Sequence, residues 1–177
     1  AENGTFDAPQ YIEKNAALQE LEKIFSNSSI QVITHNGKFD YEVLRSNGLA
    51  KPKCHFIDTM IAAWLLNSEQ NSFSLEALSE NVLNLKTISF ESLVSKADSA
   101  KGKTFADVPL NQAIPYAAED ADFTYQLAQN LKYQYFEKED ESAKKLFDME
   151  MQILPVLTQM EINGIHLDSK ILTDYNS

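Results

Sequence analysis

The feature that most constrains the fold is a carboxylate on the apolar side of a predicted helix between residues 109 and 136. On a helical wheel at about 100° per residue, one stripe of this helix is largely apolar. The stripe contains Tyr116, Asp120, Phe123, Thr124, Leu127, Ala128 and Leu131, whereas Glu119, Asp122, Gln126, Gln129 and Asn130 lie on the other side, and the acids there face water. An inward carboxylate is costly unless something pairs with it, and a metal ion is a common partner. Asp120 is therefore either a metal ligand or a capped or salt-bridged acid at a helix edge.

A second polar pair follows a short β-branched run at residues 30–34, which predicts a strand. Asn36 and Asp40 are four residues apart at the start of a helix predicted over 38–46, so both can face the same way. This is the edge of a sheet at which α/β proteins usually bind ligands. Local structure explains the same residues as well, with Asn36 as an N-cap or turn residue and Asp40 as an acid favoured by the helix dipole.

The remaining pattern predicts a helix-rich α/β protein. Further helices are predicted over 7–25, 59–66, from Ser74 onward and over 143–163, and a second strand over 54–57. Asp7 and Pro9 should begin the first helix, and Asp58 should cap the helix at 59. Residues 86–103 are irregular and polar, with a surface loop at 98–103. Pro155 should kink the last helix and Gly164 should end it, before an extended segment.

Charge and composition narrow the function. The net charge of −11 argues against broad, charge-driven binding to a phosphate backbone. A nucleic-acid substrate remains compatible, because a site that holds divalent cations needs carboxylates and the ions supply the positive charge. No apolar run approaches the roughly 20 residues of a membrane helix, and no secretory signal is visible. Cys54 is the sole cysteine, which fits a reducing compartment, and we expect a cytoplasmic protein.

Other chemistry has weak support in the sequence. His35, His55 and His166 are far apart and lack metal-ligand spacing. We interpret His35 as a surface histidine, with a substrate contact as the alternative. The five glycines are scattered, so they form no phosphate-binding loop.

With the Asn36–Asp40 and Tyr116–Asp120 pairs both in view, the chain resembles the 3′–5′ exonuclease domain of family A DNA polymerases. Residues 36–40 resemble the second exonuclease motif of that family, and residues 116–122 resemble its third motif in the tyrosine form. Residues 56–60 and 65–67 resemble the segment after the second motif, and residues 86–90 the segment with a phenylalanine near the bound strand. Residues 149–168 are similar to the junction entering the polymerase domain. Each motif is moderately specific, and five in the right order are strong.

The resemblance implies a ribonuclease H-like fold and phosphodiester hydrolysis with two Mg²⁺ or Mn²⁺ ions. It implies that Asp120 binds a metal directly, that Asp40 holds the second ion, and that Tyr116 orients the attacking water. Asn36 would support the site, and Phe39 and Phe90 would contact substrate. The implied partners are the single-stranded 3′ end of DNA and the polymerase domain of the same parent. Residues 1–142 would then be the exonuclease-like domain, and residues 143–177 the junction helix and the start of the polymerase domain.

The chain departs from the family at its first motif, an Asp-x-Glu on the opening strand that supplies two more carboxylates. No such pair lies near the N-terminus, where Asp7 is followed by Ala8 and Pro9. We therefore expect an N-terminally truncated fragment, without the opening strands and with two of the four metal ligands absent. Such a fragment should be inactive or nearly so, while its parent proofreads, and its unpaired sheet edge should associate or be completed in the parent.

Two other functions remain open at this point. One is a catalytically dead module that keeps the fold as a spacer for a polymerase domain. The retention of Asp40, Tyr116 and Asp120 argues against it, because a degenerate module has no reason to keep all three. The other is a nuclease of the ribonuclease D type, against which the polymerase-like junction at 149–168 argues.

Overall fold

Two parallel strands lie at the centre of the computed structural model, which describes residues 12–136 and 141–175. Strand β1 covers Gln31–Thr34 and β2 covers His55–Asp58, with Gln31 opposite His55 and Thr34 opposite Asp58. Helix α2, Gly37–Ser46, connects them. Both strands and the crossover helix were expected from the sequence, and their ends shift by one residue at most. In the described part of the chain the sheet has these two strands, so the second edge of β1 has no strand partner there.

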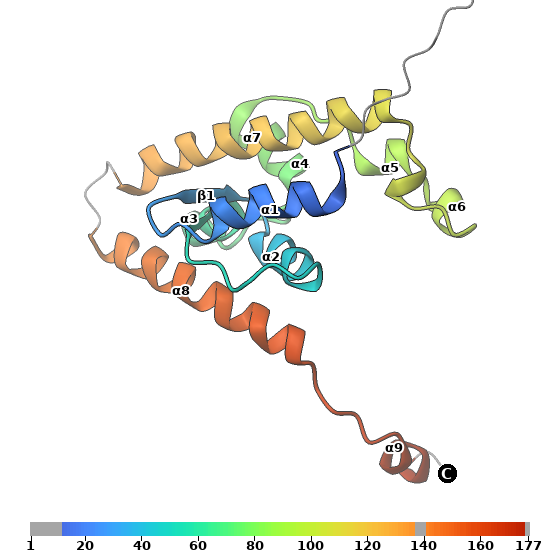
Figure 1. The fold of residues 1–177 in the computed structure, drawn as a ribbon. Helices are drawn as coiled ribbons and strands as arrows, with labels where there is room; N and C mark the ends of the chain where they lie inside the picture. The colour runs from blue at the N-terminus through green and yellow to red at the C-terminus, as the bar shows by residue number, and fades with distance from the viewer. Residues whose placement is uncertain (1–11, 137–140, 176–177) are drawn as a thin grey trace, which may run out of the picture.

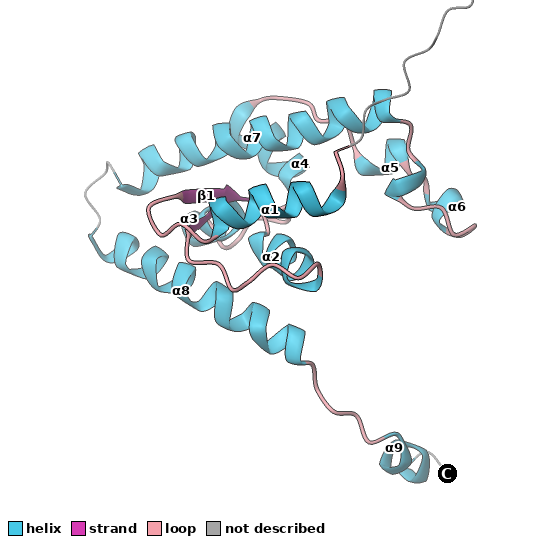
Figure 2. Ribbon diagram, in the orientation of Figure 1, coloured by secondary structure: helices cyan, strands magenta, loops and turns pink. Residues whose placement is uncertain are grey.

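Two long helices enclose the strands. Helix α7, Leu110–Phe136, contacts β1 and helix α3, Thr59–Leu66. Helix α8, Glu141–Asn163, contacts β2, α2 and α3. Figure 1 shows α7 and α8 on opposite sides of the strands and α3, with helix α1, Lys14–Phe25, near β1. Figure 2 shows how far helices outnumber strands. The helix-rich α/β architecture predicted from the sequence is confirmed.

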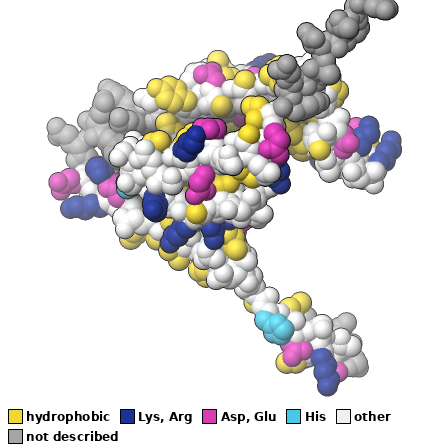
Figure 3. Space-filling model, viewed as in Figure 1, with side chains coloured by type: hydrophobic (Ala, Val, Ile, Leu, Met, Phe, Trp, Pro, Cys, Tyr) yellow, Lys and Arg dark blue, Asp and Glu magenta, His cyan; other side chains and the backbone are white. Residues whose placement is uncertain are grey.

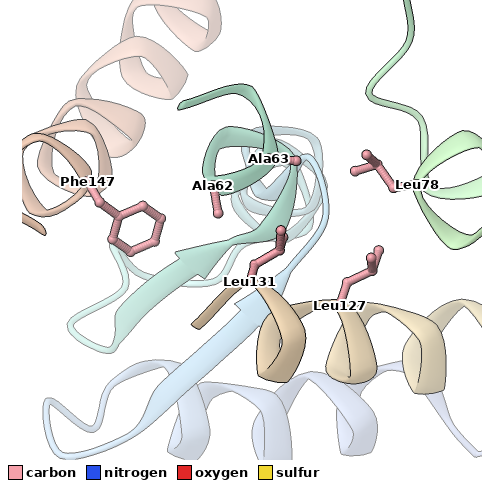
Figure 4. Packing of buried hydrophobic residues seen from close by; sticks show 6 residues of the cluster. All are labelled: Ala62, Ala63, Leu78, Leu127, Leu131 and Phe147. Atoms are coloured by element: carbon pink, nitrogen blue, oxygen red, sulfur yellow. The ribbon is translucent and has the colours of Figure 1, made fainter. Parts of the chain in front are cut away.

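The core forms where α3 meets α7 and α8. Six buried apolar side chains converge there from four elements (Figure 4), and they are Ala62, Ala63, Leu78, Leu127, Leu131 and Phe147. Leu127 and Leu131 belong to the apolar stripe that the sequence predicted for α7, so this stripe faces the core. The same helix rotation sets the direction of Tyr116 and Asp120 at its other end.

Several local expectations are corrected. Helix α1 begins at Lys14 with Glu13 as its cap, while Asp7 and Pro9 lie outside the described residues. The helix from Ser74 is α4, Leu75–Leu78, and it continues as a π-helical turn over Ser79–Leu83. The region predicted to be irregular contains helices α5, Phe90–Leu93, and α6, Lys96–Ser99, followed by a 3₁₀ turn over Phe105–Asp107. Ser89 and Ser95 cap α5 and α6, which is the signal that could have located them.

The C-terminal part leaves the body of the molecule. Helix α8 runs through Pro155 without interruption and ends at Gly164, whose φ of +68° is favoured in glycine. A short helix α9, Ser169–Tyr175, replaces the expected extended segment. The predicted division after residue 142 stays a prediction, although Phe147 of α8 belongs to the core just described. Among the described helices, none is long and apolar enough to cross a membrane.

Candidate metal and nucleic-acid site

A cleft of about 900 Å³ lies at the carboxyl end of β1 and brings together the two carboxylates singled out in the sequence. Asp40 enters it from the first turn of α2, and Asp120 from α7. Asn36 lines the same cleft. The two acids are 80 positions apart in the sequence, and the fold brings both into one cleft at the carboxyl end of β1, where α/β proteins usually bind ligands.

Asp58 fixes the turn that carries Asn36 and Asp40. Its side chain is buried, and one carboxylate oxygen caps α3 by accepting from the N–H groups of Met60 and Ile61 at 2.9 and 3.2 Å. The other oxygen accepts from the N–H of Gly37 at 2.5 Å. The predicted cap is confirmed, and the same side chain also anchors the start of α2. A Cβ at position 37 would collide with the side chain of Thr34, so glycine is required for this approach.

Asn36 adopts a left-handed backbone, with φ +62° and ψ +47°, at the N-cap position of α2. Its side chain makes no capping hydrogen bond, so of the local alternatives, N-cap or turn residue, Asn36 takes the N-cap position without capping the helix through its side chain. Asparagine tolerates this conformation better than most residues but still at some cost. Strained residues of this kind gather at functional sites, and this one lines the cleft.

Both cleft acids hold their protons more tightly than ordinary carboxyls. Burial, assisted by the charge of Asp58, raises the pKa of Asp40. Burial also raises the pKa of Asp120, while a hydrogen bond from Tyr116 acts in the opposite direction. Carboxylates that are partly shielded from water and face one cleft gain from a bound cation, because the cation compensates the charge that water no longer stabilises.

Tyr116 lies one helical turn before Asp120, and the interaction of its hydroxyl with that carboxyl contributes to the raised pKa of Tyr116. Burial first, and then the charge of Asp120, raise the pKa of Tyr116 to about 12, so its hydroxyl stays protonated at neutral pH. Its ring contacts Phe105 at a centroid distance of 5.5 Å and Phe90 at 6.5 Å. Phe90 thus lies beside the Tyr116–Asp120 pair, and its contact with substrate stays a prediction.

Two residues beside the site, Glu119 and Phe105, were not identified from the sequence. Glu119, expected to face water, is half-buried and accepts a hydrogen bond from the N–H of Ile88 at 2.5 Å. This bond ties the segment before Phe90 to α7. Phe105 stacks on Phe90 at 6.1 Å with an interplanar angle of 22°. Neither contact could be foreseen, because residues 86–105 have no periodicity that would place them against α7.

The other sequence candidates are placed less centrally. Phe39 is 62% exposed on α2 and is not among the residues that line the cleft. His35 does line the cleft and is half-buried, contrary to its interpretation as a surface residue. Its Nδ1 lies 2.9 Å from the Thr59 hydroxyl and its Nε2 lies 3.0 Å from the Phe73 carbonyl oxygen, so it braces the loop after α3. Burial lowers the pKa of His35.

As a metal site, the cleft is incomplete within the described residues. Carboxylate and amide oxygens are the donors that Mg²⁺ and Mn²⁺ prefer, and Asp40, Asp120 and Asn36 are of this type. Over residues 12–136 and 141–175, however, no group of three or more acidic, histidine or cysteine side chains is close enough to hold an ion. The oxygen donors present suit Mg²⁺ or Mn²⁺, but among the described residues there are too few of them to hold an ion.

Comparisons with known proteins agree on the type of domain. A family model described as 3′–5′ exonuclease matches residues 3–135. DNA polymerase I of Treponema pallidum is 36% identical over 166 residues, which are 93% of this chain and 16% of that protein. DNA polymerase I of Borreliella burgdorferi is 38% identical over 162 residues, which are 92% of this chain and 17% of that protein. The chain thus spans about a sixth of the length of these curated relatives.

Solved structures share the fold. The structure described as Brucella melitensis NrnC bound to pGG has a TM-score of 0.65 and 23% identity, covering 81% of this chain and 64% of that one. The same protein with bound Mg²⁺ has a TM-score of 0.58 and 20% identity over the same shares. At these identities the likeness shows the fold alone, and it confirms the ribonuclease H-like exonuclease fold predicted from the sequence.

Proposed function

Because the chain belongs to the 3′–5′ exonuclease family, we propose that it supplies part of the site at which a longer, DNA polymerase I-like protein removes 3′-terminal nucleotides. The reaction would be phosphodiester hydrolysis assisted by two Mg²⁺ or Mn²⁺ ions, in proofreading during DNA replication and repair. The observation that carries this proposal is the convergence of Asp40 and Asp120 on one cleft, with Tyr116 one helical turn before Asp120.

Each residue has a distinct role in this proposal. Asp120 would bind one ion directly, and Asp40 would hold the second, either directly or through water. Bound ions supply an activated water and charge stabilisation at the leaving 3′-oxygen. Tyr116, protonated at neutral pH, can donate or accept a hydrogen bond and would orient the attacking water. Asn36 would support the site, and Phe39 and Phe90 would contact the substrate.

The number of acids sets the activity expected of this chain. Two metal ions a few ångströms apart need more negative charge than Asp40 and Asp120 provide. We propose that the remaining carboxylates come from the longer protein, outside these 177 residues, on a strand that pairs with the second edge of β1. The 177-residue chain should then be inactive or nearly so, whereas a version extended at its N-terminus along the parent sequence should cleave. This version is called the extended protein below.

The C-terminal segment fits a further role as the connection to a polymerase domain. The exonuclease family model ends at residue 135, whereas DNA polymerase I relatives align over 92–93% of the chain. Exposed apolar side chains lie on α8, on α9 and in the segment between them. They are Leu146, Met149, Val156, Leu157, Met160, Ile162, Ile165, Leu167 and Ile171. We propose that this face packs against the polymerase domain of the parent. Lys38 of α2 pairs with Glu161 near the end of α8 at 2.5 Å, which links this helix to the turn that carries Asp40. A cytoplasmic location belongs to the same proposal.

Manganese binding tests the site in the chain itself. We expect Mn²⁺ to broaden the NMR signals of residues around Asp40 and Asp120, and each of Asp40→Asn and Asp120→Asn to weaken the binding by at least about tenfold. Binding should weaken as the pH falls from 7 to 5, because both pKa values are raised and protonation removes the ligand charge earlier than in ordinary carboxyls.

Asp122→Asn is the matched control for this measurement. Asp122 is exposed on the same helix and accepts a hydrogen bond from Gln126 at 2.7 Å, so its replacement removes one charge near the cleft without removing a proposed ligand. Broadening that is equally weakened by Asp122→Asn, or unaffected by Asp120→Asn, would show that the ion binds elsewhere and would remove the main support for the proposed function.

A further inference from the structure

Two phenylalanine rings lie side by side on the surface next to the cleft. Phe90 is 49% exposed and Phe105 is 36% exposed, and their rings are stacked at 6.1 Å. Single exposed apolar side chains are ordinary, but adjacent stacked rings form a continuous apolar surface. Phe90 and Phe105 are together called the aromatic platform.

The aromatic platform is held firmly from several directions. The ring of Phe105 packs against Tyr116 of α7. Glu119 binds the N–H of Ile88, two residues before Phe90. On the other side, the carboxylate of Asp107 accepts a hydrogen bond from the N–H of Thr104 at 2.8 Å, within the capping box that begins the 3₁₀ turn. Rings that are fixed before a ligand arrives lose little conformational entropy on binding, so such a surface is suited to stacking.

The segment between the two rings has a small excess of positive charge in an otherwise acidic chain. Between residues 91 and 104 there are three lysines, Lys96, Lys101 and Lys103, and two acids, Glu91 and Asp98. Lys103 pairs with Asp98 at 3.0 Å and Lys96 with Glu91 at 3.5 Å, and these lysine side chains are mostly exposed. Within the described residues, Lys101 has no ion pair. Exposed ion pairs contribute little to stability, so these lysines can leave their carboxylate partners and bind a phosphate instead. Figure 3 shows this group of lysines at the α6 end of the molecule.

We propose that the aromatic platform and the lysines at 96, 101 and 103 bind a single DNA strand beside the cleft, at nucleotides that precede the terminal one. Aromatic rings that stack bases next to cations that contact phosphates are the usual combination for single strands, and they tolerate any base sequence. The new elements are Phe105 and the three lysines, since a substrate contact of Phe90 was already expected from the sequence. The inference rests on the proposed function, because it takes the strand from the cleft onto this surface.

Binding of a fluorescent oligodeoxythymidine to the 177-residue chain, measured by anisotropy in EDTA, tests the inference without cleavage. Phe105→Ala should weaken binding about tenfold, and Phe105→Tyr, which keeps the ring, should retain it. The double variant Lys101→Ala/Lys103→Ala should weaken binding and reduce the slope of log K against log salt by about 1.4, the value for two phosphate contacts of a single strand.

Two matched controls separate this surface from general effects. Lys144→Ala/Lys145→Ala removes the same charge from exposed lysines at the start of α8, and Tyr175→Ala removes an exposed ring on α9. Both should leave the affinity and its salt dependence unchanged. Circular dichroism should show that Phe105→Ala remains folded, and if it does not, Phe105→Leu takes its place, because leucine keeps the apolar bulk and loses the ring.

The inference is overturned if the chain binds no oligonucleotide, if ring removal at position 105 leaves the affinity unchanged, or if the α8 control weakens binding as much as the double variant. Its failure can be told apart from that of the proposed function. Strand binding that depends on Phe105 without Mn²⁺-dependent cleavage by the extended protein would support the inference and refute the proposed function. Cleavage by the extended protein that is unchanged when Phe105 or the lysines are replaced would support the proposed function and refute the inference.

Discussion

Replacing Asp120 by asparagine in the extended protein is expected to lower the rate of 3′-nucleotide removal by about 10³-fold, a loss comparable to removing one main electrostatic contact to a transition state. Asp120 is the carboxylate that faces the cleft from α7, and asparagine keeps its shape while removing the charge that a metal requires. The measurement is single-turnover release of the 3′-nucleotide from a mismatched primer with saturating Mn²⁺, so that weaker substrate binding does not disguise the effect.

The same variant should leave the fold intact, and the direction of its effect on stability follows from the pKa of Asp120. The pKa of Asp120 is raised in the folded protein, chiefly by burial, so the folded state binds the proton more tightly than the unfolded chain. This contribution to stability is present below the ordinary carboxyl pKa and is lost as the pH rises through the folded-state value. At neutral pH an uncharged asparagine should therefore give an equal or higher Tm. A slow variant with a lowered Tm would indicate a structural role, and Asp122→Asn, as control, should change neither quantity.

Replacing Asp58 by alanine is expected to destabilise the 177-residue chain by about 3 kcal/mol. The loss combines a helix cap, worth about 1 kcal/mol, with the N–H of Gly37 left without its acceptor in a buried position, worth about 1–3 kcal/mol. For a domain of this size such a change corresponds to a fall in Tm of roughly 10 °C. Urea unfolding followed by circular dichroism measures it.

Asp168→Ala is the matched control, because Asp168 also accepts hydrogen bonds from two N–H groups, those of Lys170 and Ile171, at the start of a helix. This cap is exposed at the start of α9 and, among the described residues, makes no contact resembling the Gly37 bond, so its loss should cost well under about 1 kcal/mol of global stability. Equal effects of the two substitutions would mean that Asp58 acts as a simple cap and does not hold the turn with Asn36 and Asp40.

Helix α7 and the inward position of Asp120 could be predicted because both follow from the helical periodicity of apolar residues in the sequence. Leu127, Leu131 and Asp120 lie on one stripe of α7, and a stripe of this kind has to face the core. The two strands followed from two short apolar runs on either side of a helix, although their parallel pairing and register did not. Asp58 was therefore identified as a cap, while its bond to Gly37, twenty-one residues away, depends on the pairing of Thr34 with Asp58.

Residues without periodicity were placed wrongly or left out. Glu119 has the spacing of a water-facing acid, but the irregular segment before Phe90 folds back onto it and provides the N–H of Ile88. Phe105 follows a polar loop and gave no sign of stacking on Phe90. His35 was judged from its neighbours along the chain, whereas its partners Thr59 and Phe73 are 24 and 38 residues away. Contacts of this range arise from the tertiary fold and are invisible to local patterns.

The central claim is that this chain holds half of a two-metal site, with Asp40 and Asp120 in place and the other carboxylates in the longer protein, outside these 177 residues. Its most direct test is the cleavage of 3′-mismatched DNA in Mn²⁺ by the 177-residue chain and by the extended protein, side by side at equal concentration. We predict nucleotide release by the extended protein, abolished by Asp120→Asn, and none above background by the chain itself. Full activity of the 177-residue chain, or none from either protein, would contradict the claim.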